Sequence, residues 1–222
     1  MFVDRKDAGE KLSIELEKFK DENPIVLAIP RGGIVTAYET IKRFGFQWDL
    51  IIPRKISAPH NKEIAIGAIS LDETYLFNEK YIGMLNISQD YIKKEVFQQT
   101  EEIKRRLNKY KGNEHFLDVK NKAVIIIDDG IATGFTIQAA IKSIKKHDAK
   151  KIILAVPVAP QDTISLLEKI VDEVICLFIP DEFYGVSSYY KSFDQTTDEE
   201  VINIVRELGI SKKIISPWRE IN

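Results

Sequence analysis

The stretch AVIIIDDGIATGFTI, residues 123–137, decides the fold of this chain. It opens with a β-branched run over 124–127, which predicts a strand buried on both faces. The carboxylates Asp128 and Asp129 follow at the carboxyl end of that strand, and a loop of small and hydroxylated residues comes next. Apolar residues then recur at helical spacing to about Lys146. The segment therefore predicts a strand, an acidic pair, a loop and a helix.

The loop after the acidic pair is suited to a sugar phosphate. Backbone N–H groups at a helix N-terminus are unpaired and attract phosphate oxygens. Gly130 and Gly134 let the backbone approach a ligand, and Thr133 and Thr136 can add hydroxyl donors. The carboxylates can accept hydrogen bonds from the vicinal hydroxyls of a ribose. The spacing fits neither a Walker loop nor a dinucleotide-binding fingerprint, and the acidic pair and glycine alone would favour an ordinary helix cap.

The complete stretch resembles the signature of the type I phosphoribosyltransferases, which bind phosphoribosyl pyrophosphate. In that family two adjacent acidic residues contact the ribose hydroxyls, and the following loop holds the 5′-phosphate. Asp128 and Asp129 match the acidic pair. The residues that match the phosphate loop are Gly130, Ala132, Thr133, Gly134, Phe135 and Thr136. The resemblance implies an α/β fold, with a mostly parallel central sheet flanked by helices and a C-terminal hood.

A second loop, Pro30-Arg31-Gly32-Gly33, follows the apolar run over 25–29 that predicts the first strand. A glycine pair between strand and helix offers N–H groups to an anion, and Arg31 adds a fixed positive charge. Alone, this pattern is more often just a turn. Beside the acidic stretch it resembles the family's pyrophosphate loop, which implies a cis Pro30–Arg31 bond and pyrophosphate bound at Arg31, Gly32 and Gly33.

The interval from Arg54 to Glu63 resembles the family's flexible loop, between predicted strands over 50–53 and 64–69. Arg54 and Lys55 match a basic pair that several members carry there, and Glu63 is the acid–base candidate that its position implies. Such a lid excludes water and places cations against the leaving pyrophosphate. We predict that 56–62 is poorly ordered without ligand. A solvated hairpin with charged ends is the alternative.

The aromatic segment that begins Ile179-Pro-Asp-Glu-Phe-Tyr184 resembles the hood of the hypoxanthine–guanine phosphoribosyltransferases. Phe183 matches the residue that stacks on the base, and Tyr184 follows it. A packed aromatic cover is the alternative. Ala132 stands where the 6-oxopurine enzymes carry an Asp and is similar to the adenine enzymes instead, so the acceptor base stays open.

The length of 222 residues fits one domain over 1–222, with a core over about 25–178 and a hood over about 179–222 to which 1–20 can contribute. A formal net charge of −2 argues against a nucleic-acid partner. No apolar run approaches the ~20 residues that span a bilayer. With no apolar leader either, we expect a cytoplasmic protein without a membrane partner.

The remaining periodicity predicts alternating helices and strands. The predicted helices cover 4–20, 34–41, 88–110, a segment capped by Asp162, and a last segment from Asp194 or Asp198 to Leu208. The other predicted strands are 75–77, which we expect to pair antiparallel, and 151–157 and 174–178. Right-handed crossovers between parallel strands would bring the three candidate loops to one edge of the sheet. Nothing is assigned to 210–222.

The predicted reaction transfers ribose 5-phosphate from phosphoribosyl pyrophosphate to a small nitrogenous acceptor. The resemblance also implies Mg²⁺ held through the substrate, with Asp128 and Asp129 as candidate ligands, and a homodimer. The three histidines lie apart and predict no metal cluster. Two alternatives remain open: a regulator that senses a nucleotide or phosphoribosyl pyrophosphate, and a hydrolase of that sugar phosphate. The charge and the lack of a helix-turn-helix count against the regulator.

Overall fold

A computed structural model describes residues 1–209 of the chain, without the side chain of Glu63. Its centre is a five-stranded parallel sheet in the order β2-β1-β6-β7-β8. The strands are β1 (Ile25–Ala28), β2 (Gln47–Leu50), β6 (Ala123–Ile127), β7 (Lys151–Val158) and β8 (Glu173–Phe178). Every residue of β1 and β6 is buried. The predicted α/β fold with a mostly parallel central sheet is confirmed.

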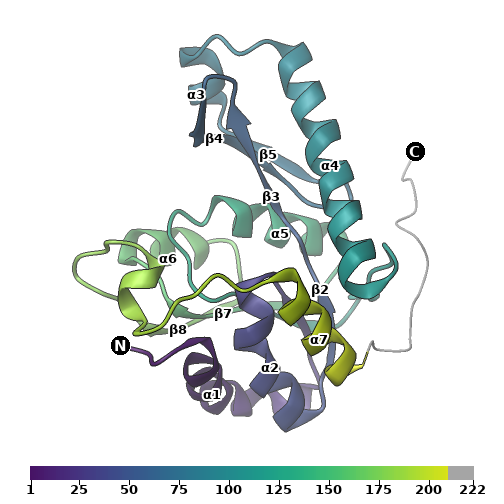
Figure 1. Cartoon of the computed structure of the whole chain (residues 1–222), viewed down its shortest axis with the longest axis vertical. Helices are drawn as coiled ribbons and strands as arrows, with labels where there is room; N and C mark the ends of the chain where they lie inside the picture. The colour runs from purple at the N-terminus through teal and green to yellow at the C-terminus, as the bar shows by residue number, and fades with distance from the viewer. Residues whose placement is uncertain (210–222) are drawn as a thin grey trace.

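Helices cover both faces of this sheet (Figure 1). One face packs against α1 (Arg5–Leu16) and α2 (Gly32–Phe44), and the other against α5 (Phe135–Lys146) and α6 (Gln161–Leu167). A 3₁₀ turn, η1 (Glu17–Glu22), continues α1. Helices are needed on both faces because successive apolar side chains of β1 and β6 point to opposite sides of the sheet, where they join two separate hydrophobic clusters.

A second, antiparallel sheet projects from the core with the order β3-β4-β5 (Figure 1). Its strands are β3 (Arg54–Ala58), β4 (Asn61–Ile69) and β5 (Tyr75–Phe77), and it is accompanied by α3 (Glu79–Met84) and the long α4 (Gln89–Lys111). The antiparallel pairing of 75–77 and the long helix were predicted, whereas α3 was not.

One predicted boundary in the first half of the chain is wrong, and the predicted lid has a defined backbone. The second core strand is Gln47–Leu50 rather than 50–53, because residues 51–53 lead out of the core sheet to β3. Residues 56–62, predicted as a polar lid, form the end of β3, a turn and the start of β4, and Ile56 and Ala58 bury one face of β3. That this segment is poorly ordered without ligand stays a prediction. The alternative of a hairpin with charged ends describes this segment.

The last described helix packs against α2 and α4. The segment after β8 contains a 3₁₀ turn, η2 (Val186–Tyr189), and leads to α7 (Asp198–Leu208). Thr197 caps α7 with a capping box that includes Glu200. The helix predicted to be capped by Asp162 is α6, but its N-cap is Pro160 and Asp162 lies in its first turn. No helix within residues 1–209 is both long and apolar enough to cross a membrane.

Candidate functional site

The acidic pair and the turn after β1 meet at the carboxyl edge of the parallel sheet. β1 and β6 are neighbours, and their register pairs Ala28 with Ile127, so both loops leave the sheet at the same level. The Pro30–Arg31 peptide bond is cis, as predicted. A Cβ atom on Gly33 would lie 2.9 Å from the Cα of Asp128. Only glycine at this place allows the turn to approach the acidic pair so closely.

The two carboxylates are partly buried and differ in their partners. The backbone N–H of Asp129 donates to Oδ1 of Asp128 at 2.8 Å. Burial and the adjacent charge of Asp129 raise the pKa of Asp128 well above its usual range. The hydroxyl of Tyr190 donates to the carbonyl oxygen of Asp129 at 2.6 Å and so fixes the backbone beside the pair. The site therefore places two carboxyl groups side by side, where hydroxyl donors or a cationic ligand would be favoured.

Arg5 neutralises part of this charge. Its Nε lies 2.6 Å from Oδ2 of Asp129, and both side chains are largely buried. The sequence reasoning missed this contact, because the two residues are 124 positions apart. No local signal distinguishes Arg5 from Lys6, the other cation in the first turn of this helix.

The loop over 130–136 is fixed by hydrogen bonds to the end of β7 and to α6, and its middle residues are exposed. Gly134 is the N-cap of α5 with a φ of 69°, a conformation that favours glycine. The N–H of Ile131 donates to the carbonyl oxygen of Val158, and Thr163 Oγ1 donates to that of Ala132. Within residues 1–209, the hydroxyl of Thr133 makes no hydrogen bond and its side chain is exposed. In the described part of the chain, no side chain caps the N-terminus of α5, which therefore suits an anion.

The predicted cations do not all face the acidic pair. Arg31 Nη1 lies 3.7 Å from Oδ1 of Asp198, at the start of α7. Hydrogen bonds from Lys109 and Tyr110 lower the pKa of Asp198 to about 2, so this carboxylate is a strong anionic partner. Arg54 Nε donates to Oε1 of Gln99 on α4 at 3.0 Å.

The other two lid candidates lie on the projecting hairpin. Lys55 lies half-buried in β3, next to Arg54. The backbone of Glu63 lies in β4, and its side chain is outside the described part of the structure. The structure therefore places these candidates on the hairpin that begins shortly after the core strand β2.

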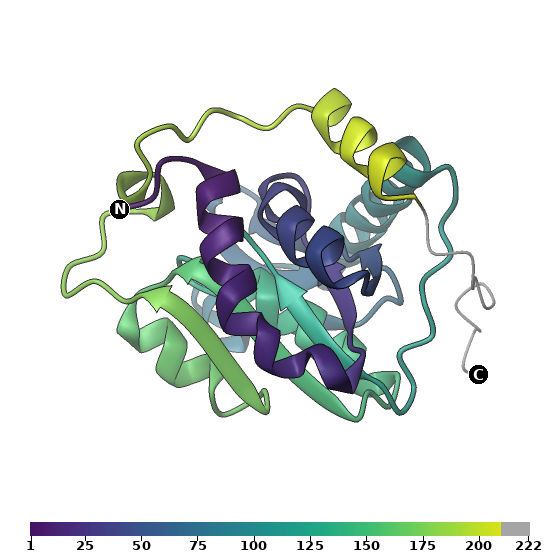
Figure 2. The same cartoon turned by 90° about the horizontal axis from the view of Figure 1, so that it is seen from below.

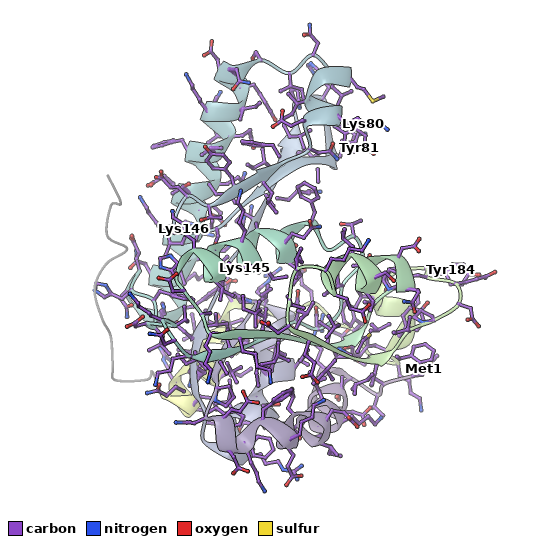
Figure 3. The ribbon with its side chains drawn as sticks, turned by 180° about the vertical axis from the view of Figure 1, so that it is seen from behind. Met1, Lys80, Tyr81, Lys145, Lys146 and Tyr184 are labelled. Atoms are coloured by element: carbon purple, nitrogen blue, oxygen red, sulfur yellow. The ribbon has the colours of Figure 1, made fainter. Side chains whose placement is uncertain are left out.

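The two hood candidates have different surroundings. Phe183 stacks on Tyr189 with ring centroids 5.7 Å apart, and it packs onto a cluster that contains Phe2 and Tyr190. Tyr184 is 77% exposed and projects away from the rest of the molecule (Figure 3). One face of the Phe183 ring is thus already covered, which favours the packed aromatic cover over a free stacking platform.

A cavity of about 430 Å³ lies at the opposite, amino end of the sheet, away from the acidic pair. It is lined by α2, the start of β2 and the end of α7, including Tyr38, Lys42 and Glu207. Part of its wall is formed by Leu208 and Gly209, the last described residues.

Replacing Gly32 with alanine is expected to disturb the site directly. The added methyl group would lie 1.8 Å from Oδ2 of Asp129 and 2.7 Å from Nε of Arg5, so the turn or the ion pair must move. We expect a loss of about 1–3 kcal/mol in unfolding free energy. We also expect the affinity for phosphoribosyl pyrophosphate to fall about tenfold or more, equivalent to at least about 1.4 kcal/mol. Thermal melting and calorimetric titration measure the two effects.

The matched control is Gly83→Ala, because a methyl group there meets nothing within 4 Å. This variant should bind as the wild type does. Unchanged binding by Gly32→Ala would show that the close approach of the turn has no role in the site.

Comparisons with known proteins agree with this geometry. The family model described as "Phosphoribosyl transferase domain" matches residues 4–191. A Mycobacterium tuberculosis protein named "Putative phosphoribosyl transferase Rv0571c" is 33% identical over 202 residues, which cover 91% of this chain and 46% of that protein. The chain thus spans about half the length of the curated relatives it matches. The crystal structure of TT1426 from Thermus thermophilus is 32% identical, with a TM-score of 0.78, and the match covers 93% of this chain and 98% of that one.

Proposed function

The chain belongs to the phosphoribosyl transferase domain family, and from this premise we propose that it transfers ribose 5-phosphate from phosphoribosyl pyrophosphate to a nitrogenous acceptor. One observation carries the proposal: the acidic pair, the glycine turn after β1 and the uncapped N-terminus of α5 converge at one edge of the sheet. This edge is where ligands bind in open α/β sheets.

Each loop is assigned to a different group of phosphoribosyl pyrophosphate. In our proposal the loop over 130–136 and the N-terminus of α5 bind the 5′-phosphate with backbone N–H groups. Asp128 and Asp129 accept hydrogen bonds from the ribose hydroxyls. The N–H groups of Gly32 and Gly33 face the pyrophosphate, which lies on the β1 side of the ribose.

The reaction breaks the bond between C1 of the ribose and the pyrophosphate oxygen, which keeps the electron pair. A bond from C1 to the acceptor nitrogen forms, and that nitrogen loses a proton. Positive charge develops on the ribose ring in the transition state, so two carboxylates beside the ring stabilise it. Cationic donors near the pyrophosphate stabilise the negative charge that the leaving group gains.

The acidic pair also fits a magnesium ion that arrives with the substrate. Mg²⁺ binds through one or two carboxylates together with substrate phosphates, and it keeps several waters. Among residues 1–209, no group of three or more His, Cys, Asp or Glu side chains could hold a metal. Asp128 and the oxygen of Asp129 that does not pair with Arg5 would supply the one or two carboxylates required. When bound, the ion neutralises phosphate charge.

The proposal also covers the organisation of the chain. We propose one domain with a hood to which both ends contribute, and a homodimer in the cytoplasm. Backbone hydrogen bonds support the shared hood, because Phe2 N–H donates to the carbonyl oxygen of Tyr189 and Lys191 N–H donates to that of Phe2. Figure 2 shows the N-terminal segment beside η2. Light scattering would test the dimer.

Release of pyrophosphate from phosphoribosyl pyrophosphate, measured with and without a panel of purine and pyrimidine bases, tests the function. A transferase releases pyrophosphate only with its acceptor and forms the corresponding nucleotide. Release without any base would show a hydrolase instead. Binding without release under every condition would indicate a sensor, and absence of binding would contradict the proposal.

A further inference from the structure

Arg5 approaches the acidic pair from the first turn of α1, at the N-terminal end of the chain. Its Nε lies 2.6 Å from Oδ2 of Asp129, and the two side chains are only 12% and 17% exposed. Its Nη1 donates to the carbonyl oxygen of Asp194 at 2.7 Å. Its guanidinium carbon lies 3.7 Å from the centre of the Phe193 ring. These three contacts fix both the position and the plane of the group.

Some N–H donors of the Arg5 guanidinium have no hydrogen-bond partner among residues 1–209. A guanidinium carries five N–H donors in one plane. Asp129 and Asp194 take one donor each, and Nη2 has no hydrogen-bond partner among residues 1–209. A half-satisfied guanidinium held rigid by an aromatic ring is well prepared to bind a phosphate, for which it is the favoured side chain.

The position of Arg5 relative to the two loops indicates which phosphate it would meet. An added methyl group on Gly32 would lie 2.7 Å from Nε of Arg5, so Arg5 lies directly at the turn after β1. Arg31, which belongs to that turn, has its side chain directed to Asp198 instead. The turn therefore has a cation beside it, but that cation comes from α1.

We propose that Arg5, rather than Arg31, is the side chain that binds the pyrophosphate group of the substrate. This inference rests on the proposed function, since it assigns a residue to the substrate of that reaction. Arg5 keeps its contact with Asp129 and directs its remaining donors to the pyrophosphate. It thereby links the ribose-binding carboxylate to the leaving group and lowers the charge repulsion between them.

The test compares three ligands with the full chain. Phosphoribosyl pyrophosphate and inorganic pyrophosphate carry the group that Arg5 would bind, whereas ribose 5-phosphate carries only the groups assigned to the other loop. Calorimetric titration of Arg5→Met should show a loss of affinity of about 10- to 100-fold for the first two ligands, since hydrogen bonds to charged groups contribute about 1.5–3 kcal/mol. Affinity for ribose 5-phosphate should change much less.

Three further variants serve as controls. Arg5→Lys keeps the charge but not the planar fork, so its affinity for pyrophosphate should lie between those of the wild type and Arg5→Met. Arg31→Met, the variant of the competing candidate, should lose much less affinity for pyrophosphate than Arg5→Met, and a larger loss would overturn the inference. Lys11→Met removes a cation from the same helix, which pairs with Asp7 at the surface, and should have no effect on any ligand. If Arg5→Met does not fold, Arg5→Lys carries the test alone.

The outcomes separate this inference from the proposed function. If the wild type binds all three ligands and Arg5→Met binds them equally well, the inference is wrong and the proposed function stands. An equal loss for ribose 5-phosphate and for pyrophosphate would show that Arg5 merely orders Asp129, which also overturns the inference. If the wild type binds none of the ligands, both proposals fail.

Discussion

Asp128→Asn should lower turnover of phosphoribosyl pyrophosphate by about 100-fold or more, the effect typical of removing one preorganised electrostatic group, while the protein stays folded. The reason is that the carboxylate ends the central strand beside the phosphate loop and loses its charge without a change in shape. Burial and the charge of Asp129 raise the pKa of Asp128, so its ionised form is disfavoured in the folded protein. Removing the charge is therefore expected to leave stability unchanged or to increase it.

Asp129→Asn should lose activity for the same reason but should also lose stability. Its carboxylate is the partner of the largely buried Arg5, and the variant leaves that guanidinium without a counter-ion. The two single variants and the double variant, each measured for turnover, for calorimetric affinity and for thermal midpoint, separate charge from folding. A folded Asp128→Asn protein with full activity and affinity would remove the acidic pair from the proposed site.

Lys111→Met should cost about 3–5 kcal/mol of unfolding free energy, because it leaves a buried carboxylate without its partner. Lys111 Nζ lies 2.6 Å from Oδ1 of Asp49, and the two side chains are 4% and 9% exposed. The backbone N–H of Leu117 donates to the other carboxylate oxygen, so the pair joins the end of α4 and the loop before β6 to the edge strand β2. Denaturant unfolding measures the loss.

The loss of unfolding free energy in Lys111→Met is expected to grow as the pH rises. Burial already raises the pKa of Asp49 despite the nearby ammonium group, and removal of that group raises it further. A carboxyl group with a raised folded-state pKa costs stability as pH rises above its unfolded value of about 4. The loss should therefore be smaller at about pH 4 than at about pH 7.

Two variants control for the role of the buried charge. Asp49→Asn in the Lys111→Met background should recover part of the loss. Lys109→Met removes a partly exposed ion pair with Asp198 from the same helix and should cost no more than about 1 kcal/mol. A pH-independent loss that Asp49→Asn does not reduce would indicate lost packing instead.

Local patterns predicted much of the fold and part of the site. The β-branched run of β6 and the helical spacing of α5 are each set by residues close in sequence, and both elements were found where expected. The cis bond at Pro30–Arg31 was expected from the family resemblance and is present. The hairpin of β3 was only the alternative interpretation, because the burial of Ile56 comes from a cluster that joins residues far apart in the sequence.

The sequence by itself determined the alternation of strands and helices and the chemistry of the two loops at the carboxyl ends of β1 and β6. Side-chain periodicity and glycine positions encode these features over a few residues. Only the tertiary structure decided which cation meets the acidic pair. That choice depends on the strand order, which places Gly32 against Asp129, and on the packing of α1, which brings Arg5 across 124 positions. Charges along a chain do not reveal their partners, because the pairing is set by which elements pack together.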